Sequence, residues 1–473
     1  MTARRTGGSG PSARALTLRA RAALLAAWAA GRASRLLGRG GGHALPGRVA
    51  DLLDPLLLPR LAERLAGGVV LVTGTNGKTT TTRLIVAGLT AAGHTVVTNP
   101  TGSNLRQGIL SSLITSSDLR GRLDGTIGVF EVDEVSLPRV AAETRPRLAV
   151  VLNIFRDQLD RHADLETVAA RVSDGLRLVE GPVLLNADDP LVADLARRSK
   201  VAAEYFGIDA SVGDGGPVAA DGYTDADRCP VCGRTLTYSR VFFAQLGHYA
   251  CPSGDFSRPA PTVTLISSGA PTSTGTPFVM RAAGALQAAR TASPGTYSLY
   301  NSLAALAACS MLGADLEAAA AAVSSTTPAF GRSEQIDILG RQIRLVLVKN
   351  PTGCAQVIDT FLVGDADAPL LLGLNDAAAD GRDVSWIWDT PFESLAGRTG
   401  AVVVCGTRAD DLSLRLRYAD VEAHARPTVG AAVDDLLASV PEGGHGYVLG
   451  SYTAMLDLRR HLLDRSARPG VAA

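Results

Sequence analysis

The sequence lacks an excess of charge of either sign, because 46 lysine and arginine residues are balanced by 46 aspartate and glutamate residues. This balance excludes a global electrostatic attraction to nucleic acid, so we expect no nucleic-acid partner. Cysteine is also scarce, since six cysteines in 473 residues are too few for a disulfide framework. We therefore expect a cytoplasmic protein, and the chain length predicts about three domains.

The N-terminus lacks an apolar run long enough to cross a membrane. The run at residues 22–30 is too short to span a bilayer, although the arginines on both sides of it resemble the flanks of a signal peptide. We predict instead a basic helix at about residues 15–37, within an N-terminal segment 1–50. This helix either packs on the next domain or rests on an anionic membrane surface, and the sequence leaves both alternatives open.

The chain does contain an alternation of short β-branched runs with helical segments. Residues 69–73, 126–132, 147–153 and 182–186 have the pattern of strands, and residues 79–92 and 165–179 that of helices. Such an alternation predicts an α/β fold with a parallel sheet, whose ligands lie at the carboxyl ends of the strands. We place a central domain at residues 51–335 and a second α/β domain at residues 336–473. A stretch rich in Gly, Ser, Thr and Pro at about residues 210–294 is expected to be a ribbon-like insertion.

A glycine-bearing loop follows the strand at residues 69–73 and opens the next helix. It consists of Gly74, Thr75, Asn76, Gly77, Lys78, Thr79 and Thr80. Its glycines let backbone N–H groups approach phosphate oxygens, Lys78 adds a positive charge, and the Thr79 hydroxyl can ligate magnesium. We expect this loop to bind ATP and Lys78 to be catalytic, although two residues separate the glycines where the usual pattern has four.

The loop resembles that of Mur ligases and folylpolyglutamate synthases, which join an amine to a carboxylate through an acyl phosphate. The resemblance implies a Mur-ligase-like central domain, a Rossmann-like C-terminal domain, and magnesium at Glu131 in the segment 131–134. It also implies that Asn301 faces the adenine and that Arg332 reaches the nucleotide phosphates. Gln158 stands where many relatives have a histidine for a second metal, which leaves that second site open.

Three further features resemble the MurT family, the ligase subunits of the lipid II isoglutaminyl synthase. The first is a C-terminal set of segments at residues 349–353, 374–389 and 406–409. The second is an absence, because no cysteine of the chain lies in a glutaminase-like elbow. The resemblance therefore implies a GatD-like glutamine amidotransferase as partner in a heterodimer, with Asp383 completing the partner's catalytic triad. The expected reaction amidates the D-glutamate α-carboxyl of the lipid II stem peptide, and the lipid substrate makes peripheral membrane contact a further expectation.

The third feature is a cysteine cluster that resembles the zinc ribbon of the same family. Cys229 and Cys232 have C-x-x-C spacing, and Cys251 would be a third ligand of a structural zinc ion. Gly254 stands where a fourth cysteine would be expected. His248, Asp255 and water are left as alternatives for the fourth ligand.

Two other functions are compatible with parts of this pattern. An amino-acid-adding ligase of the folylpolyglutamate type would act alone and ignore ammonia. A nucleic-acid-binding zinc-ribbon protein with a regulatory ATPase is disfavoured by the neutral charge and by the missing fourth cysteine.

Overall fold

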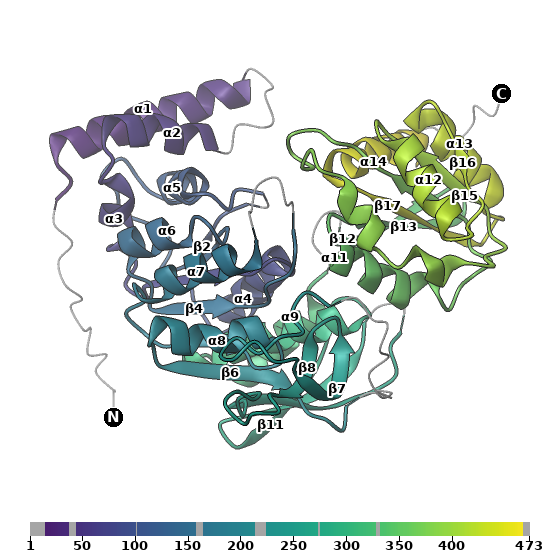
Figure 1. The fold of residues 1–473 in the computed structure, drawn as a ribbon. Helices are drawn as coiled ribbons and strands as arrows, with labels where there is room; N and C mark the ends of the chain where they lie inside the picture. The colour runs from purple at the N-terminus through teal and green to yellow at the C-terminus, as the bar shows by residue number, and fades with distance from the viewer. Residues whose placement is uncertain are drawn as a thin grey trace, which may run out of the picture.

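The computed structural model describes residues 15–36, 44–100, 102–157, 164–212, 224–272, 275–327 and 332–466. Figure 1 shows two bodies that are each built around a β-sheet, with helices α1 (Leu18–Leu36) and α2 (Leu45–Leu53) along one edge of the first body. None of the helices in these ranges combines the length and the apolar character that crossing a bilayer requires.

The first body contains a nine-stranded sheet with the strand order β11-β10-β9-β6-β5-β4-β1-β3-β2. The strands are β1 (Val69–Thr73), β2 (Val96–Thr98), β3 (Ile127–Glu131), β4 (Leu148–Val151), β5 (Val183–Asn186), β6 (Ala203–Ile208), β9 (Val263–Ser268), β10 (Pro277–Ala282) and β11 (Ala285–Arg290). All neighbours from β2 to β9 pair in parallel, whereas β10 and β11 are antiparallel. The predicted α/β fold with a parallel sheet is confirmed.

Residues 69–72 of β1 are all apolar, because helices cover both faces of the sheet. Val69 and Leu71 enter one hydrophobic core, and Val70 and Val72 enter the core on the opposite face. The first core is formed with α5 (Arg106–Thr115), α6 (Leu137–Thr144), α7 (Leu165–Leu176) and α8 (Pro190–Ser199). The second is formed with α4 (Lys78–Ala91), α9 (Thr296–Met311) and α10 (Leu316–Ser325). This three-layer arrangement fixes the carboxyl end of β1, where the glycine-bearing loop begins.

Helices α1, α2 and α3 (Leu57–Ala62) add a further layer over α5. The inner face of α1 enters the first core, and the Trp28 Nε1 donates a hydrogen bond to the Ile114 carbonyl at 3.2 Å. At Gly47 of α2, a Cβ atom would lie 2.0 Å from the Gln107 carbonyl oxygen, so this close helix contact requires glycine. The predicted N-terminal helix therefore packs on the central domain. The boundary predicted at residue 50 falls inside α2.

The predicted insertion at residues 210–294 is only partly a ribbon. Strands β7 (Thr237–Phe243) and β8 (Leu246–Ala250) form a separate two-stranded sheet, as a ribbon would. The remaining strands of this stretch, β9 to β11, extend the central sheet, so the prediction was wrong for them. Short strands separated by polar turns have the same composition as an irregular insertion, and the long-range pairing of β9 with β6 is invisible in the local sequence.

The second body has a six-stranded sheet with the strand order β12-β13-β17-β14-β15-β16. Its strands are β12 (Arg332–Ile338), β13 (Arg341–Leu347), β14 (Leu370–Gly373), β15 (Val402–Cys405), β16 (His424–Ala425) and β17 (His445–Gly450), and its α-helices are α11 (Pro351–Val357), α12 (Ala409–Tyr418), α13 (Val429–Ser439) and α14 (Tyr452–Ser466). Only β12 is antiparallel to its neighbour, which confirms a second, Rossmann-like α/β domain. The boundary predicted between residues 335 and 336 lies inside β12, so the domain begins earlier.

Candidate active site

The glycine-bearing loop joins β1 to α4, as the sequence pattern predicts. Gly77 precedes the first residue of α4 with a φ of 87°, and a Cβ atom there would lie 2.2 Å from the Asn301 side-chain oxygen. Only glycine allows α9 to bring Asn301 this close to the loop. No side chain caps the N-terminus of α4 among the described residues. The first N–H groups of α4 can therefore point at an anion, as in other phosphate-binding helix N-termini.

Lys78 is buried and folded back onto its own loop. Its Nζ donates to the Gly74 carbonyl at 2.6 Å and to the Glu134 carboxylate at 3.2 Å. Burial by itself would lower the pKa of Lys78, but the surrounding carboxylates, Glu134 first, raise it above its ordinary value. The ammonium of Lys78 in turn lowers the pKa of Glu134, against the effect of that carboxyl's own burial. Both groups are therefore charged, and Glu134 is the counterion of the loop lysine.

Thr79 and Glu131 come together at the carboxyl ends of β1 and β3. The Thr79 hydroxyl donates to the Glu131 carboxylate at 2.7 Å, and both side chains are buried. The backbone of Glu131 is held on both sides by the Asn99 amide, with two hydrogen bonds of 2.9 Å each. Hydroxyl and carboxylate oxygens at this spacing suit a small divalent cation beside a phosphate group.

A cavity of about 130 Å³ lies beside this loop, between the two domains. Residues from both domains form its wall, among them Asn76, Gly77, Phe155, Tyr297, Asn301 and Gly353. Asn301, which was predicted to face the adenine, is thus in the wall of the cavity. The Asn301 side-chain oxygen accepts a hydrogen bond from the Thr81 hydroxyl at 3.3 Å, which orients the amide toward α4.

Buried carboxylates on the turn after β5 hold α9 and the neighbouring loop in place. Asp188 accepts hydrogen bonds from the Tyr300 hydroxyl at 2.7 Å and from Arg258 at 2.5 Å. Asp189 accepts from the Ile154 N–H at 2.9 Å, and burial raises the pKa of Asp189 to about 7. Tyr300 precedes Asn301, so this network fixes the register of the helix that carries the cavity asparagine. The local sequence does not indicate these contacts, because Asp188 and Tyr300 lie far apart along the chain.

Polar contacts join the two domains at the edge of the cavity. The Asn350 amide donates to the Asn76 side-chain oxygen at 3.0 Å, and Lys349 forms an ion pair with Asp157. A second ion pair joins Arg156 to Asp389 at 3.5 Å. Of these contacts, the hydrogen bond between Asn76 and Asn350 connects the glycine-bearing loop directly to the N-terminus of α11.

Of three other predicted positions, one lies apart from the glycine-bearing loop, and the side chains of the other two lie outside the part of the chain that the structure describes. Asp383 is partly exposed on the C-terminal domain, and its Oδ1 accepts a hydrogen bond from the Ser385 N–H at 2.8 Å. This contact fixes the carboxylate at the start of a short 3₁₀ helix, Ser385–Asp389. Arg332 begins β12, but its side chain lies outside the described part of the chain, as does Gln158.

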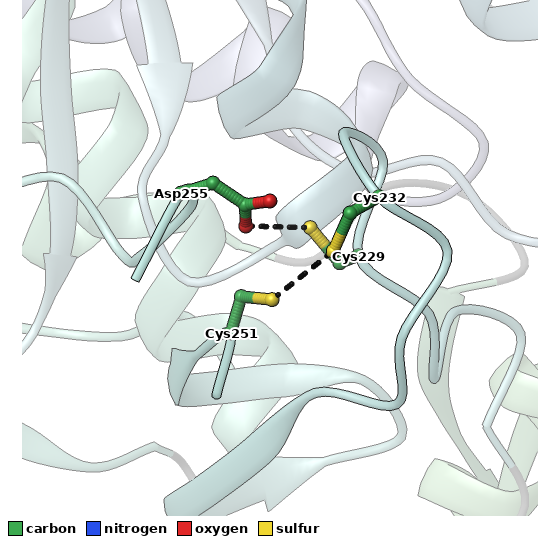
Figure 2. Close-up of side chains that lie close together, drawn as sticks. All are labelled: Cys229, Cys232, Cys251 and Asp255. Carbon is green, nitrogen blue, oxygen red and sulfur yellow. Dashed lines mark hydrogen bonds between the residues drawn. The ribbon is translucent and has the colours of Figure 1, made fainter. Parts of the chain in front are cut away.

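In the structure, the side chain of Asp255 lies beside the three cysteines of the cluster. Figure 2 shows Cys229, Cys232, Cys251 and Asp255 pointing toward one another, and their ligand atoms all lie within 4.8 Å of each other. The Cys229 and Asp255 ligand atoms are 3.4 Å apart, and the sulfurs of Cys232 and Cys251 are 3.5 Å apart. His248 is turned elsewhere, because its Nε2 forms a hydrogen bond with the Ile208 carbonyl at 2.8 Å. Of the side chains left open as the fourth ligand, Asp255 is the one whose carboxylate lies beside the three cysteines.

Comparison with known proteins matches the two domains to described families. Residues 72–221 match the Mur ligase middle domain, and residues 347–455 match the MurT ligase C-terminal domain. Among solved structures, a pseudomurein peptide ligase type C from Methanothermus fervidus has a TM-score of 0.63 at 21% identity, with 84% of this chain and 78% of that chain covered. MurF from Thermotoga maritima, solved in complex with ADP, has a TM-score of 0.61 at 16% identity, with 88% and 84% covered.

Similarity to curated proteins extends over almost the whole chain. The lipid II isoglutaminyl synthase (glutamine-hydrolyzing) subunit MurT of Streptococcus pneumoniae is 35% identical, with 92% of this chain and 96% of the relative covered. The subunit of the same name from Staphylococcus aureus (strain COL) is 33% identical, with 83% of this chain and 86% of that relative covered. The two domain matches agree with the 35% identity over almost the whole chain. The chain therefore belongs to the MurT family of Mur-ligase-like enzymes.

Proposed function

We propose that this chain is the ligase subunit of a lipid II isoglutaminyl synthase. The reaction converts the α-carboxyl of D-glutamate in the lipid II stem peptide to the amide of D-isoglutamine. The observation that carries the proposal is the 35% identity to a subunit of that name, with 92% of this chain covered. Lys78, Thr79 and Glu131 at the carboxyl ends of neighbouring strands supply the matching chemistry.

In this proposal MgATP binds at the loop and the cavity and supplies the phosphoryl group that activates the carboxylate. The N–H groups at the start of α4 and the ammonium of Lys78 offset the negative charge of the phosphates. Thr79 and Glu131 hold the magnesium ion, and Asn301 contacts the adenine. Arg332 is proposed to reach the phosphates from the start of the C-terminal domain. Closure of the two domains, which a hydrogen bond between Asn76 and Asn350 joins, would keep water from the acyl phosphate.

The nitrogen is proposed to come from a GatD-like glutaminase in a heterodimer with this chain. Burial raises the pKa of the Cys309 and Cys354 thiols to about 12 and that of Cys405 to about 11. Thiols held so strongly in the protonated form are poor nucleophiles near neutral pH. The other three cysteines belong to the cluster with Asp255. Ammonia production therefore falls to the partner, and Asp383 is proposed to complete its triad.

An amidation assay tests this function directly. We expect the chain with MgATP and lipid II to form the amide when ammonium is supplied at high concentration. With glutamine as the nitrogen source, we expect product only when the glutaminase partner is added. Absence of amidation at high ammonium, combined with turnover of a free amino acid, would overturn the proposal in favour of an amino-acid-adding ligase that acts alone.

We further propose that the four-residue cluster binds a structural zinc ion with three cysteines and one aspartate. Zinc holds sulfur at about 2.3 Å, so tetrahedral ligands lie about 3.5–3.8 Å apart. The separations of 3.5 Å between Cys232 and Cys251 and of 3.4 Å between Cys229 and Asp255 are close to this requirement. An aspartate is ionised near neutral pH, so Asp255 offers the carboxylate oxygen that such a site needs as its fourth ligand.

The zinc proposal predicts a specific pattern among variants. We expect one zinc ion per chain, an affinity lowered by at least about 100-fold in Asp255→Ala, and retained binding in Asp255→Cys. Asp227→Ala is the control, because Asp227 is an exposed acid near the same cysteines and lies outside the cluster. Elemental analysis and competition with a chelator measure these quantities. A zinc-free wild-type protein, or equal affinity in wild type and Asp255→Ala, would contradict the assignment.

The proposed location is the cytoplasm, at the inner face of the plasma membrane. The reaction consumes ATP, and its proposed substrate is anchored in the membrane by a lipid. Free thiols at all six cysteines are compatible with a reducing compartment.

A further inference from the structure

The outward face of α1 is apolar although it is exposed to solvent. Leu18, Ala22, Leu25 and Ala29 follow one another at helical spacing on the side opposite the residues that enter the core. Leu18 is 85% exposed and Leu25 is 51% exposed. The inner face already packs on the central domain, so fold stability does not explain these leucines.

The neighbouring helix α2 also carries exposed apolar residues. Helices α1 and α2 run antiparallel, since the Arg19 Nε donates to the Leu53 carbonyl at 2.6 Å near one end and Gly31 adjoins Pro46 near the other. Leu52, on the last turn of α2, is 83% exposed. Figure 1 places both helices along an outer edge of the molecule. We call the exposed residues Leu18, Leu25, Leu52 and Leu56, with the arginines named next, the α1–α2 surface.

The charges on the α1–α2 surface are all positive. Helix α1 contains no acidic residue, and its exposed Arg21 and Arg32 lie beside the apolar stripe. Arg48 is exposed on α2, one turn before Leu52. The two acids of α2 and the turn after it are both in ion pairs, because Asp51 pairs with Arg106 at 2.6 Å and Asp54 pairs with Arg60. A chain with no net charge thus has one locally cationic and apolar surface.

We propose that the α1–α2 surface rests on an anionic lipid bilayer, with its leucines at the boundary between headgroups and acyl chains. Arginine beside leucine on one helix face is the composition of helices that lie in a membrane interface. Each arginine near the surface adds attraction to anionic headgroups. This inference rests on the proposed function, because a lipid-linked substrate has to be reached at the membrane. A second copy of the chain is a poorer occupant, since a twofold contact would bring these arginines against one another.

Vesicle flotation of the full chain tests this inference. We expect binding to vesicles of equal parts phosphatidylglycerol and phosphatidylcholine, and at least about tenfold weaker binding to phosphatidylcholine alone. The double variants Leu18→Glu with Leu25→Glu, and Arg21→Glu with Arg32→Glu, should each weaken binding to the anionic vesicles by at least about tenfold. Leu414→Glu is the matched control, because Leu414 is a 50%-exposed helical leucine on the C-terminal domain. Its binding should equal that of wild type.

Three outcomes would overturn the inference: absent wild-type binding, equal binding to both vesicle types, or unchanged binding in both double variants. A dimer that the Leu18 and Leu25 substitutions dissociate would instead assign the surface to a second copy. Failure of the proposed function can be distinguished from failure of the membrane inference. Ammonium-driven amidation of a water-soluble substrate with a shortened lipid should be unchanged in the double variants, and its absence in wild type would reject the function without affecting the vesicle result.

Discussion

Replacement of Lys78 by methionine is expected to lower the rate of ammonium-driven amidation by about 10³-fold or more, because no other loop side chain offsets the charge on the transferred phosphoryl group. Methionine keeps the length of the side chain and removes its charge. The measurement is steady-state turnover with lipid II, MgATP and saturating ammonium. Lys200→Met is the control, since Lys200 is an exposed lysine at the end of α8 and should retain full activity.

The same substitution also leaves the buried Glu134 without its counterion. We expect the free energy of unfolding to fall by about 3–5 kcal/mol, as it does when one partner of a buried ion pair is removed. Adding Glu134→Gln to Lys78→Met should restore stability in a urea titration and leave activity lost. Recovery of activity in the double variant would contradict a catalytic role for Lys78, because it would show that the single variant was inactive only through misfolding.

Asp383→Asn is expected to lower glutamine-driven amidation by about 10³–10⁴-fold and to spare ammonium-driven amidation. A triad carboxylate orients the partner's imidazole and stabilises its charged form, and asparagine does neither. Asparagine can still accept the hydrogen bond from the Ser385 N–H, so the loop geometry should be retained. Both rates are measured with the same purified heterodimer.

Asp410→Asn is the matched control for Asp383, because Asp410 is another acid at the surface of the C-terminal domain and lies outside the proposed triad. In Asp410→Asn, the rates of glutamine-driven and ammonium-driven amidation should both equal those of wild type. Equal loss of the two activities in Asp383→Asn would refute a role in the partner's triad and would indicate instead a defect in the ligase itself.

The parts of the site that could be predicted are those whose residues are close in the sequence. The loop from Gly74 to Thr79 follows a buried strand and opens a helix, and these signals are all local. The position of Glu131 at the end of a neighbouring strand follows from the rule that carboxyl ends of parallel strands meet at one edge. Local pattern and sheet geometry are therefore sufficient to identify the phosphate end of the site.

Contacts between distant residues could not be predicted in the same way. The acidic segment after β3 was recognised, but its local sequence does not show which carboxylate faces magnesium and which pairs with Lys78. Glu134 was missed as the lysine's partner for this reason. Asp255 was one of several possible ligands until the turn after β8 brought it to within 3.4 Å of Cys229. The contact between Tyr300 and Asp188 likewise depends on packing between α9 and the turn after β5.

Domain boundaries are difficult to place from the sequence for a related reason. Composition changes gradually along the chain, whereas a strand belongs to whichever sheet offers it hydrogen-bond partners. Strands β9 to β11 lie in a stretch rich in polar turns, yet they belong to the central sheet, and β12 pairs with the C-terminal sheet before the predicted boundary. The roles of Asn301 and Arg332 toward a nucleotide stay predictions.

The amide contact between Asn76 and Asn350 has a thermodynamic consequence. A ligand in the cavity touches both domains, so its binding free energy includes the free energy of bringing the domains to one spacing. Thermodynamic linkage makes this coupling reciprocal. If the ligand favours the closed spacing of the domains, a change that favours the closed spacing raises the affinity for the ligand. Substitutions at Asn350, far from the loop in sequence, should therefore change the population of the closed spacing and the affinity for the cavity ligand together.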